Sequence, residues 1–268
     1  MAREQSNEAY EKIIKANKLQ VADIVVCHHK HSLLSSLIMY GTKSFWSHAA
    51  LMFVIRDEGG GFDNSFVIES VRAGISITNL NDYFSDPQHY DVGIKRLEKP
   101  WFANPDQGLA IRKTVRGHML DFIKDKYDFG MILDIAAMVI ASLVFGTRVA
   151  LFGLEHEIRR ASRKKTHKQR LVPSRFICSG FVQYSLYTTV RDLVRAKQLT
   201  MDDLKLVNFN PTLQTYPDLL NLPQDSLLAT TPDDIARAES LTWKYLVKDG
   251  RVYEVRSQAE VERITSGA

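Results

Sequence analysis

The chain has 268 residues, of which 45% are hydrophobic and 25% charged, and its formal net charge is +4. This size and composition allow a substantial core, in one large domain or two unequal ones. Only two cysteines are present, Cys27 and Cys178, which argues against a disulfide-based scaffold and favours a reducing compartment. The charged first twenty residues contain no apolar signal segment, so we expect a cytoplasmic protein.

The first part of the chain is rich in short strands. Helical spacing of apolar residues predicts an amphipathic helix at 7–19 and a second helix at 32–40, which Gly41 ends. Apolar runs bounded by turn residues predict strands at 23–27, 49–55, 66–70, 75–77 and 91–97. Because these strands follow one another through short turns, we expect an antiparallel sheet.

Helices dominate the rest of the chain. We expect helices at 105–126, within 129–165 and at 178–197, an irregular stretch at 207–231, and a final hairpin from 241–246 and 251–255. The apolar side of the helix at 105–126 is expected to carry Leu109, Val115, Leu120 and Phe122. Thr231 followed by Pro232 predicts another helix start. The fold class is therefore α+β, with sheet and helices largely segregated along the sequence.

Three residues with catalytic chemistry fall at the ends of predicted elements. Cys178 opens a helix, where unpaired N–H groups and the helix dipole favour a thiolate. His48 begins one strand and Glu69 ends another, so the three could form a nucleophile, its base and an orienting group. Each also has a simpler interpretation: a small buried hydrophobe, a structural histidine and a solvated carboxylate. Sequence spacing does not decide whether they meet.

The order of several short motifs resembles a known family. The chain is similar to the permuted papain-like cysteine hydrolases of the NlpC-type superfamily, in which the strand that bears the histidine precedes the helix that bears the cysteine. The matching stretches, in chain order, are 22–26, 37–42, 46–51, 67–70 with Gly74-Ile75, 126–129, 177–179 and 231–236.

The resemblance implies a single domain over residues 1–268, with a sheet or barrel packed against helices. It also implies that Cys178 is the nucleophile, His48 its base and Glu69 the orienting group, with the Cys178 N–H forming part of an oxyanion hole. The resemblance also implies that Tyr127 and Ser179 lie near the substrate, although Tyr127 is equally compatible with a core tyrosine. One departure is Gly180, since family members often carry an acidic residue there.

Residues 129–172 form an apolar and then basic insertion, longer than compact members of the family need. Residues 131–154 are strongly apolar, and a basic cluster follows. Residues expected to contact a lipid or membrane are Ile140, Leu143, Phe145, Arg159, Arg160, Lys164 and Lys165. A true membrane span is disfavoured, because Asp134 and Arg148 would lie inside it and Gly146 interrupts it.

Other interpretations of this insertion remain open. It is compatible with a helical hairpin that covers the active site, with an interface between subunits of a homo-oligomer through residues 131–154, or with binding of an anionic membrane surface or an acyl chain. The basic cluster is also compatible with a solvated helix face. Nucleic-acid binding is not expected, since no aromatic residues alternate with the charges.

The segment Cys27-His28-His29-Lys30-His31 contains four potential metal ligands close together. Neighbouring side chains on a strand point to opposite faces, and no second ligand cluster accompanies them, so we expect no metal and no cofactor. His28 is instead expected to line the active-site cleft, because the resemblance puts this loop near the pocket.

These observations predict a thiol-dependent hydrolase or acyltransferase that cleaves an amide or ester through an acyl-cysteine intermediate. The apolar insertion favours a lipid-like or amphiphilic substrate. The alternatives are a peptide amidase acting on cell-wall-type fragments and a non-catalytic module that binds a membrane or a protein through a papain-like shell.

Overall fold

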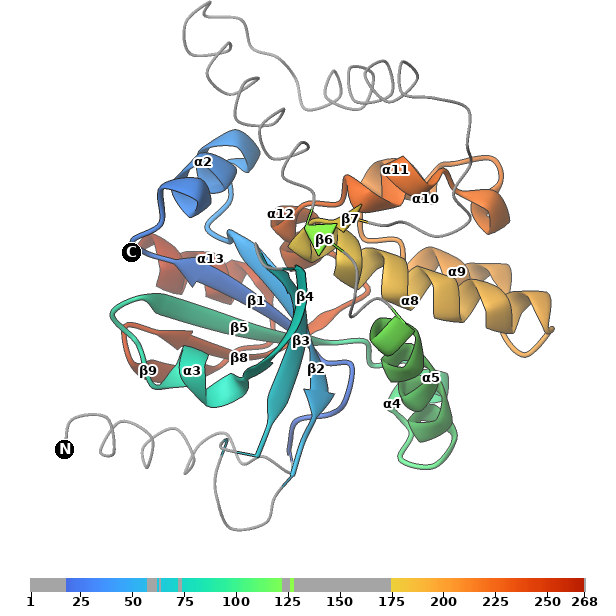
Figure 1. Ribbon diagram of the computed structural model, residues 1–268, viewed down its shortest axis with the longest axis horizontal. Coiled ribbons are helices and arrows are strands. Elements are labelled where there is room, and N and C mark those ends of the chain that lie inside the picture. Colours follow the sequence, from blue (N-terminus) through green and yellow to red (C-terminus); the bar gives the residue numbers. More distant parts are fainter. Residues whose placement is uncertain are drawn as a thin grey trace, which may run out of the picture.

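The computed structural model describes residues 18–56, 62, 64–71, 74–121, 126–127 and 175–267. Within these residues the fold combines a large antiparallel sheet with helices on its faces (Figure 1). This architecture confirms the expected α+β class. The predicted helices at 7–19 and within 129–165 lie largely or wholly outside the described residues.

The described part of the chain contains a seven-stranded sheet of order β4-β3-β2-β1-β5-β8-β9. Its strands are β1 (Ile24–His29), β2 (His48–Val54), β3 (Phe66–Val71), β4 (Gly74–Asn79), β5 (Tyr90–Arg96), β8 (Thr242–Lys248) and β9 (Arg251–Glu254). Every neighbouring pair is antiparallel. The C-terminal hairpin therefore completes a sheet begun by the first hundred residues.

The central strands are almost continuously apolar because both faces of the sheet are covered. In β1, Val26 belongs to one core cluster and Val25 to the other, as the alternation of side chains along a strand requires. Ala49 and Ala50 divide in the same way along β2. All four are fully buried. The sheet is therefore the partition between two apolar cores.

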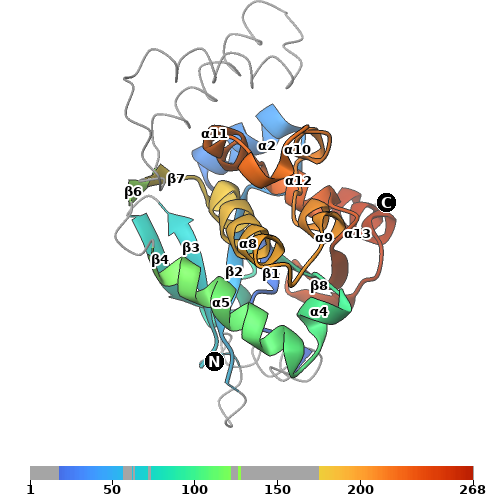
Figure 2. The ribbon, with the colours of Figure 1, turned by 90° about the vertical axis from the view of Figure 1, so that its right-hand side faces the viewer.

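The larger core lies between the sheet and most of the helices (Figure 2). The helices on this side are α4 (Pro100–Ala103), α5 (Gln107–Asp121), α8 (Cys178–Arg195), α9 (Met201–Leu206), α10 (Pro211–Gln214), the 3₁₀ turn η2 (Leu219–Asn221), α11 (Gln224–Leu228), α12 (Pro232–Arg237) and α13 (Gln258–Ser266). Every residue of α8 from Cys178 to Val190 is buried. This helix is thus the centre of the larger core, and its first residue is held in place by packing.

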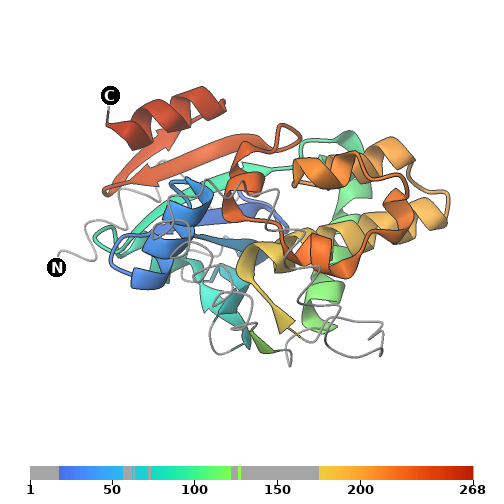
Figure 3. The same cartoon turned by 90° about the horizontal axis from the view of Figure 1, so that it is seen from above.

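Two further elements lie near the ends of the sheet. The short helix α3 (Leu80–Phe84) contributes Leu80, Tyr83 and Phe84 to the smaller core on the opposite face. Helix α2 (Leu33–Thr42) connects β1 to β2 and lies beside the sheet, as seen from above in Figure 3. Ser32 caps α2 by accepting a hydrogen bond from the Ser35 N–H.

A separate two-stranded pairing links segments far apart in the sequence. The strand β6 (Lys126–Tyr127) runs parallel to β7 (Arg175–Phe176), with Tyr127 opposite Phe176. Because β7 ends two residues before Cys178, this pairing brings Tyr127 close to the start of α8.

Several sequence predictions are confirmed. Thr231 caps α12 with a reciprocal capping box that includes Asp234, and Pro232 occupies the first turn. The predicted strands are all present, with ends that differ by at most two residues, and the final hairpin is β8–β9. No helix in the described ranges has the length and apolar character needed to cross a membrane.

Four predictions are wrong. The helix expected to end at Gly41 continues to Thr42, and Lys43 caps it. The helix expected at 105–126 begins at Gln107, after a separate short helix α4, and Leu109 and Leu120 are exposed while Val115 is buried. The stretch 207–231 is a series of short helices rather than irregular. Residues 258–266 form a helix, α13, that was not predicted. In the last three cases tertiary packing of isolated apolar residues, such as Leu213 and Val261, decides the outcome.

Candidate active site

Cys178 is the first residue of α8 and is 4% exposed. The preceding Ile177 has an extended backbone, and no side chain caps the helix. The first turn therefore presents backbone N–H groups that no side-chain cap occupies, next to the thiol. α8 also packs against β2 and β3, so Cys178 faces the strands that carry His48 and Glu69.

His48 is the first residue of β2, directly opposite Cys27 of β1. Its Nε2 lies 2.5 Å from Oε2 of Glu69. A hydrogen bond also joins the imidazole to the Cys178 side chain. Since Nε2 faces the carboxylate, Nδ1 is the nitrogen left for the thiol. The structure therefore brings together the three residues that the sequence suggested, across 130 positions of the chain.

Glu69 is 1% exposed, so the interpretation of it as a solvated carboxylate is wrong. Besides His48, its Oε2 accepts a hydrogen bond from the Tyr83 hydroxyl at 2.5 Å. Its Oε1 accepts one from the Thr78 hydroxyl. A buried carboxylate is stable only when donors replace the lost water, and here both oxygens have them.

The electrostatics of this triad favour an ion pair. Burial alone would lower the pKa of His48, but Cys178 and Glu69 beside it raise that pKa from 6.5 to about 10. Burial raises the pKa of the Cys178 thiol, yet the His48 charge and backbone hydrogen bonds from Ala49 and Ser179 bring it below its ordinary value of 9.0. The pair therefore favours a thiolate beside an imidazolium.

The charge of Glu69 is sustained by the same contacts. Burial raises the pKa of its carboxyl, but the hydrogen bonds and charge of His48 and the hydroxyls of Thr78 and Tyr83 lower it below 4.5. Glu69 consequently stays ionised opposite the imidazolium. A permanent negative charge at this position holds the ring in one orientation and stabilises its protonated form.

The second cysteine has the opposite environment. Cys27 lies within β1, is 1% exposed, and its thiol pKa is raised well above 9.0 by burial and by the negative charges of Glu69 and Cys178. The two thiols of the chain thus differ in ionisation: the surroundings of Cys178 favour the thiolate, and those of Cys27 favour a neutral core thiol.

Gly180 lies where α8 passes close to the backbone of α11. A Cβ at this position would lie 2.5 Å from the Leu228 carbonyl oxygen and 2.9 Å from its Cα. These are backbone atoms of α11, which cannot move aside as a flexible side chain can. Any larger side chain would push α8 away from α11, so an acidic group cannot be accommodated here.

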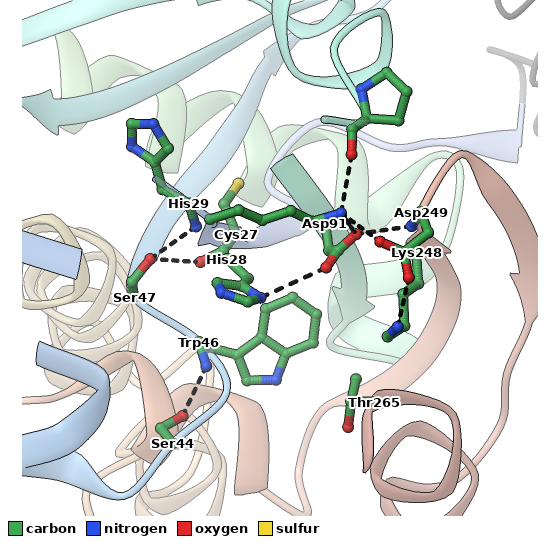
Figure 4. A network of polar contacts seen from close by, with 12 residues as sticks. Cys27, His28, His29, Ser44, Trp46, Ser47, Asp91, Lys248, Asp249 and Thr265 are labelled. Carbon is green, nitrogen blue, oxygen red and sulfur yellow. Dashed lines mark hydrogen bonds and ion pairs between the residues drawn. The ribbon is translucent and has the colours of Figure 1, made fainter. Parts of the chain in front are cut away.

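Ser179 and His28, both expected near the substrate, have polar partners within the protein. The Ser179 hydroxyl is fully buried and donates to the Thr230 carbonyl oxygen at 2.6 Å, so it joins α8 to the loop before α12. His28 Nδ1 lies 3.5 Å from Oδ2 of Asp91, and its ring packs edge-on against Phe45. Figure 4 shows the contact between His28 and Asp91. His28 therefore belongs to a neighbouring polar network.

That network ties the end of the sheet to the C-terminal hairpin. Lys30 Nζ lies 2.7 Å from Asp91 Oδ1 and 2.6 Å from Asp249 Oδ1. Ser47, immediately before His48, accepts from the His29 N–H at 3.1 Å and donates to the Cys27 carbonyl at 3.2 Å (Figure 4). These contacts fix the start of β2, and with it the position of His48.

Sequence reasoning missed Thr78 and Tyr83, the two hydroxyls on Glu69. Thr78 lies on β4 and Tyr83 on α3, both outside the motifs that suggested the site. Register is the signal that links Thr78 to Glu69: Thr78 pairs with Val67, two residues before Glu69, which puts both side chains on one face. No sequence pattern indicates Tyr83.

Of the remaining predicted site residues, the structure describes only Tyr127. The backbone of Tyr127 lies opposite Phe176, close in sequence to Cys178. Ile140, Leu143, Phe145, Arg159, Arg160, Lys164 and Lys165 lie outside the described residues. Among the residues that are described, no group of three or more histidine, cysteine or acidic side chains is arranged to hold a metal ion.

Comparisons with known proteins add no assignment. No protein-family model matches the sequence, and no curated protein matches it. The functional interpretation therefore depends on the geometry of this site.

Proposed function

We propose that this protein is a permuted papain-like cysteine hydrolase or acyltransferase of the NlpC-type superfamily, acting on an amide or ester. The observation that carries the proposal is the buried set of Cys178, His48 and Glu69, with the imidazole hydrogen-bonded to both partners. A structural histidine would need neither a thiol of lowered pKa nor a fully satisfied carboxylate behind it.

The reaction begins with the thiolate of Cys178. Its sulfur attacks the carbonyl carbon, and the carbonyl π electrons move to oxygen to form a tetrahedral oxyanion. The uncapped first turn of α8, including the Cys178 N–H, supplies donors to that oxygen. The C–N or C–O bond then breaks, and His48 gives its proton to the leaving amine or alcohol.

An acyl-cysteine remains and is resolved by the same imidazole. Neutral His48 removes a proton from water, whose oxygen attacks the thioester carbon; collapse releases a carboxylic acid and returns the thiolate–imidazolium pair. An amine or alcohol in place of water gives acyl transfer. Glu69 keeps the ring oriented through both steps and stabilises each imidazolium state.

A lipid-like or amphiphilic substrate is the favoured class. The β6–β7 pairing brings Tyr127 close to the start of α8, and residues 131–154, which follow Tyr127 in the chain, are strongly apolar in sequence. An apolar sequence of this kind suits an acyl chain or a membrane surface better than a polar peptide. A peptide amidase and a non-catalytic module remain the competing proposals.

The first test compares the two thiols. The intact protein is treated with iodoacetamide from pH 5 to pH 9, and alkylation of Cys178 and Cys27 is followed by peptide mass spectrometry. We expect Cys178 to react at least about tenfold faster at pH 7, and His48→Ala to remove the advantage, since the imidazolium stabilises the thiolate. Equal, slow reaction of both thiols would contradict the catalytic proposal and favour the non-catalytic module.

The second test addresses the substrate. Nitrophenyl acetate and nitrophenyl octanoate are offered to the wild type and to Cys178→Ala, and intact-mass spectrometry detects the acyl adduct. An adduct on the wild type alone supports covalent catalysis, and preference for octanoate supports an apolar acyl group. Equal reaction rates with both esters would contradict the proposal of a lipid-like substrate but not the proposal that Cys178 is the nucleophile.

A further inference from the structure

We propose that Tyr83 is a positioning residue of this site: its hydroxyl, together with that of Thr78, holds the Glu69 carboxylate in the one orientation that serves His48. This inference rests on the proposed function and extends it to a residue outside the three reacting or orienting groups. The inference follows from which hydrogen-bond donor contacts each of the two oxygens of the buried Glu69 carboxylate.

The division of donors is asymmetric. Oε2 accepts from both Tyr83 OH and His48 Nε2, each at 2.5 Å, while Oε1 accepts from Thr78. Rotation of the carboxylate about its terminal bond would break all of these contacts together. With Oε1 and one lone pair of Oε2 already engaged, the remaining acceptor site faces the imidazole, which restrains the ring to the tautomer with a proton on Nε2.

The placement of Tyr83 makes it a stable donor. It lies on α3, is 8% exposed, and contacts the Tyr90 ring edge-on with centroids 5.0 Å apart. Burial and the nearby negative charge of Glu69 raise the pKa of its phenol well above 10.0. The hydroxyl therefore keeps its proton, and remains a donor, throughout the pH range in which a thiol ionises.

Other titratable groups also surround Glu69. Cys27 on β1 and Tyr90 on β5 sense its charge, and both have a raised pKa, so they stay neutral near pH 7. His48 on β2 links Glu69 to Cys178 on α8. The charged groups of the site are thus Glu69, His48 and Cys178. A change in the pKa of Glu69 therefore alters the pKa of Cys178, because the His48 imidazolium interacts with both.

Tyr83→Phe tests the proposal, because it removes one oxygen and keeps the ring in the core. Loss of one hydrogen bond raises the pKa of Glu69, weakens the imidazolium and raises the pKa of Cys178. The acidic limb of the Cys178 alkylation profile should therefore move upward by about 0.5 to 1 pH unit. Tyr90→Phe is the matched control: it removes the same hydroxyl from a tyrosine that contacts the Tyr83 ring, and its limb should match the wild type.

A second pair of variants covers the case in which Tyr83→Phe does not fold. Thr78→Val removes the hydroxyl at nearly constant volume and should shift the limb in the same direction, whereas Thr78→Ser retains the donor and should restore the wild-type position. A purely structural role would lower thermal stability and leave the limb in place. An unshifted acidic limb in folded Tyr83→Phe would overturn the inference about Tyr83 and leave the proposed function standing. If Tyr83→Phe does not fold, an unshifted limb in Thr78→Val has the same meaning.

Failure of the proposed function is distinguishable from this result. If Cys178 of the wild type alkylates no faster than Cys27, there is no activated thiol to position and both proposals fall. If Cys178 of the wild type alkylates faster than Cys27, and the acidic limb of its alkylation rate lies below pH 9, the proposed function stands. The shifts measured in the hydroxyl variants then decide the role of Tyr83.

Discussion

Nε2 of His48 lies 2.5 Å from Oε2 of Glu69, which leaves a single ring nitrogen for the thiol of Cys178. The carboxylate is almost fully buried, so little water screens its interaction with the imidazole. His48 is consequently held between two anionic groups, and each partner affects the ionisation of the others.

Removing the Cys178 thiol should lower the pKa of His48. The Cys178 thiolate contributes to the pKa of about 10 at His48, so Cys178→Ala should lower that pKa by about 1 pH unit or more. The ring titration is followed by NMR of histidine-labelled protein. Cys27→Ala serves as the control and should leave the His48 titration in place, because Cys27 is neutral near pH 7. An unchanged His48 in Cys178→Ala would show that the two side chains are not coupled.

Neutralising the Glu69 carboxylate should slow the alkylation of Cys178. In Glu69→Gln, one of the Glu69 acceptors becomes an NH₂ group that faces a donor, and the charge opposite the imidazolium is lost. We expect the alkylation rate of Cys178 at pH 7 to fall about tenfold, and the free energy of unfolding to fall by about 1–3 kcal/mol. Glu254→Gln, on the exposed face of β9, is the control for both measurements. A wild-type alkylation rate in folded Glu69→Gln argues that the carboxylate is only structural.

A methyl group at Gly180 should disturb the start of α8. The added Cβ would meet the Leu228 backbone at 2.5 Å, so Gly180→Ala should lower the free energy of unfolding by about 1–3 kcal/mol. Gly117→Ala in α5 is the matched control: nothing lies within 4 Å of its Cβ, and alanine there should stabilise the helix by about 0.5–1 kcal/mol. Both values come from urea denaturation. Equal effects of the two substitutions would contradict the close approach of α8 to α11.

Lys95 should make stability depend on pH. This lysine is 1% exposed, donates to the carbonyl oxygens of Ile235, Ala236 and Ala238, and lies 4.8 Å from the Trp243 ring centroid. Burial lowers the pKa of its amine from 10.5 to about 7. Between these two pH values the unfolded chain binds the extra proton, so raising the pH favours the folded state.

The matching measurement compares the wild type with Lys95→Met from pH 7 to pH 10. The free energy of unfolding of the wild type should rise relative to the variant, with a slope of at most about 1.4 kcal/mol per pH unit. Lys113→Met, an exposed substitution on α5, should show no such slope. Parallel pH profiles for the wild type and Lys95→Met would mean that the three carbonyl oxygens keep the amine protonated in the folded protein.

Much of the local structure was predictable because it depends on neighbours in the sequence. The Thr231 capping box and the helix start at Cys178 need only a few consecutive residues, and the apolar runs of β1 and β2 identify themselves as strands. The errors occur where distant packing decides. Leu109 and Leu120 look like core residues in a helical pattern, but only the face with Val115 meets the rest of the protein.

Local sequence patterns were enough to predict which chemical groups stand at the ends of strands and helices, and they suggested Cys178, His48 and Glu69 as a set. The folded arrangement was needed to show that these three side chains meet, and that Thr78 and Tyr83 are the other partners of the carboxylate. The reason is physical. Strand and helix periodicity is a local property of the chain, whereas contact across 130 residues depends on strand register and on the packing of α8, which many distant residues set together.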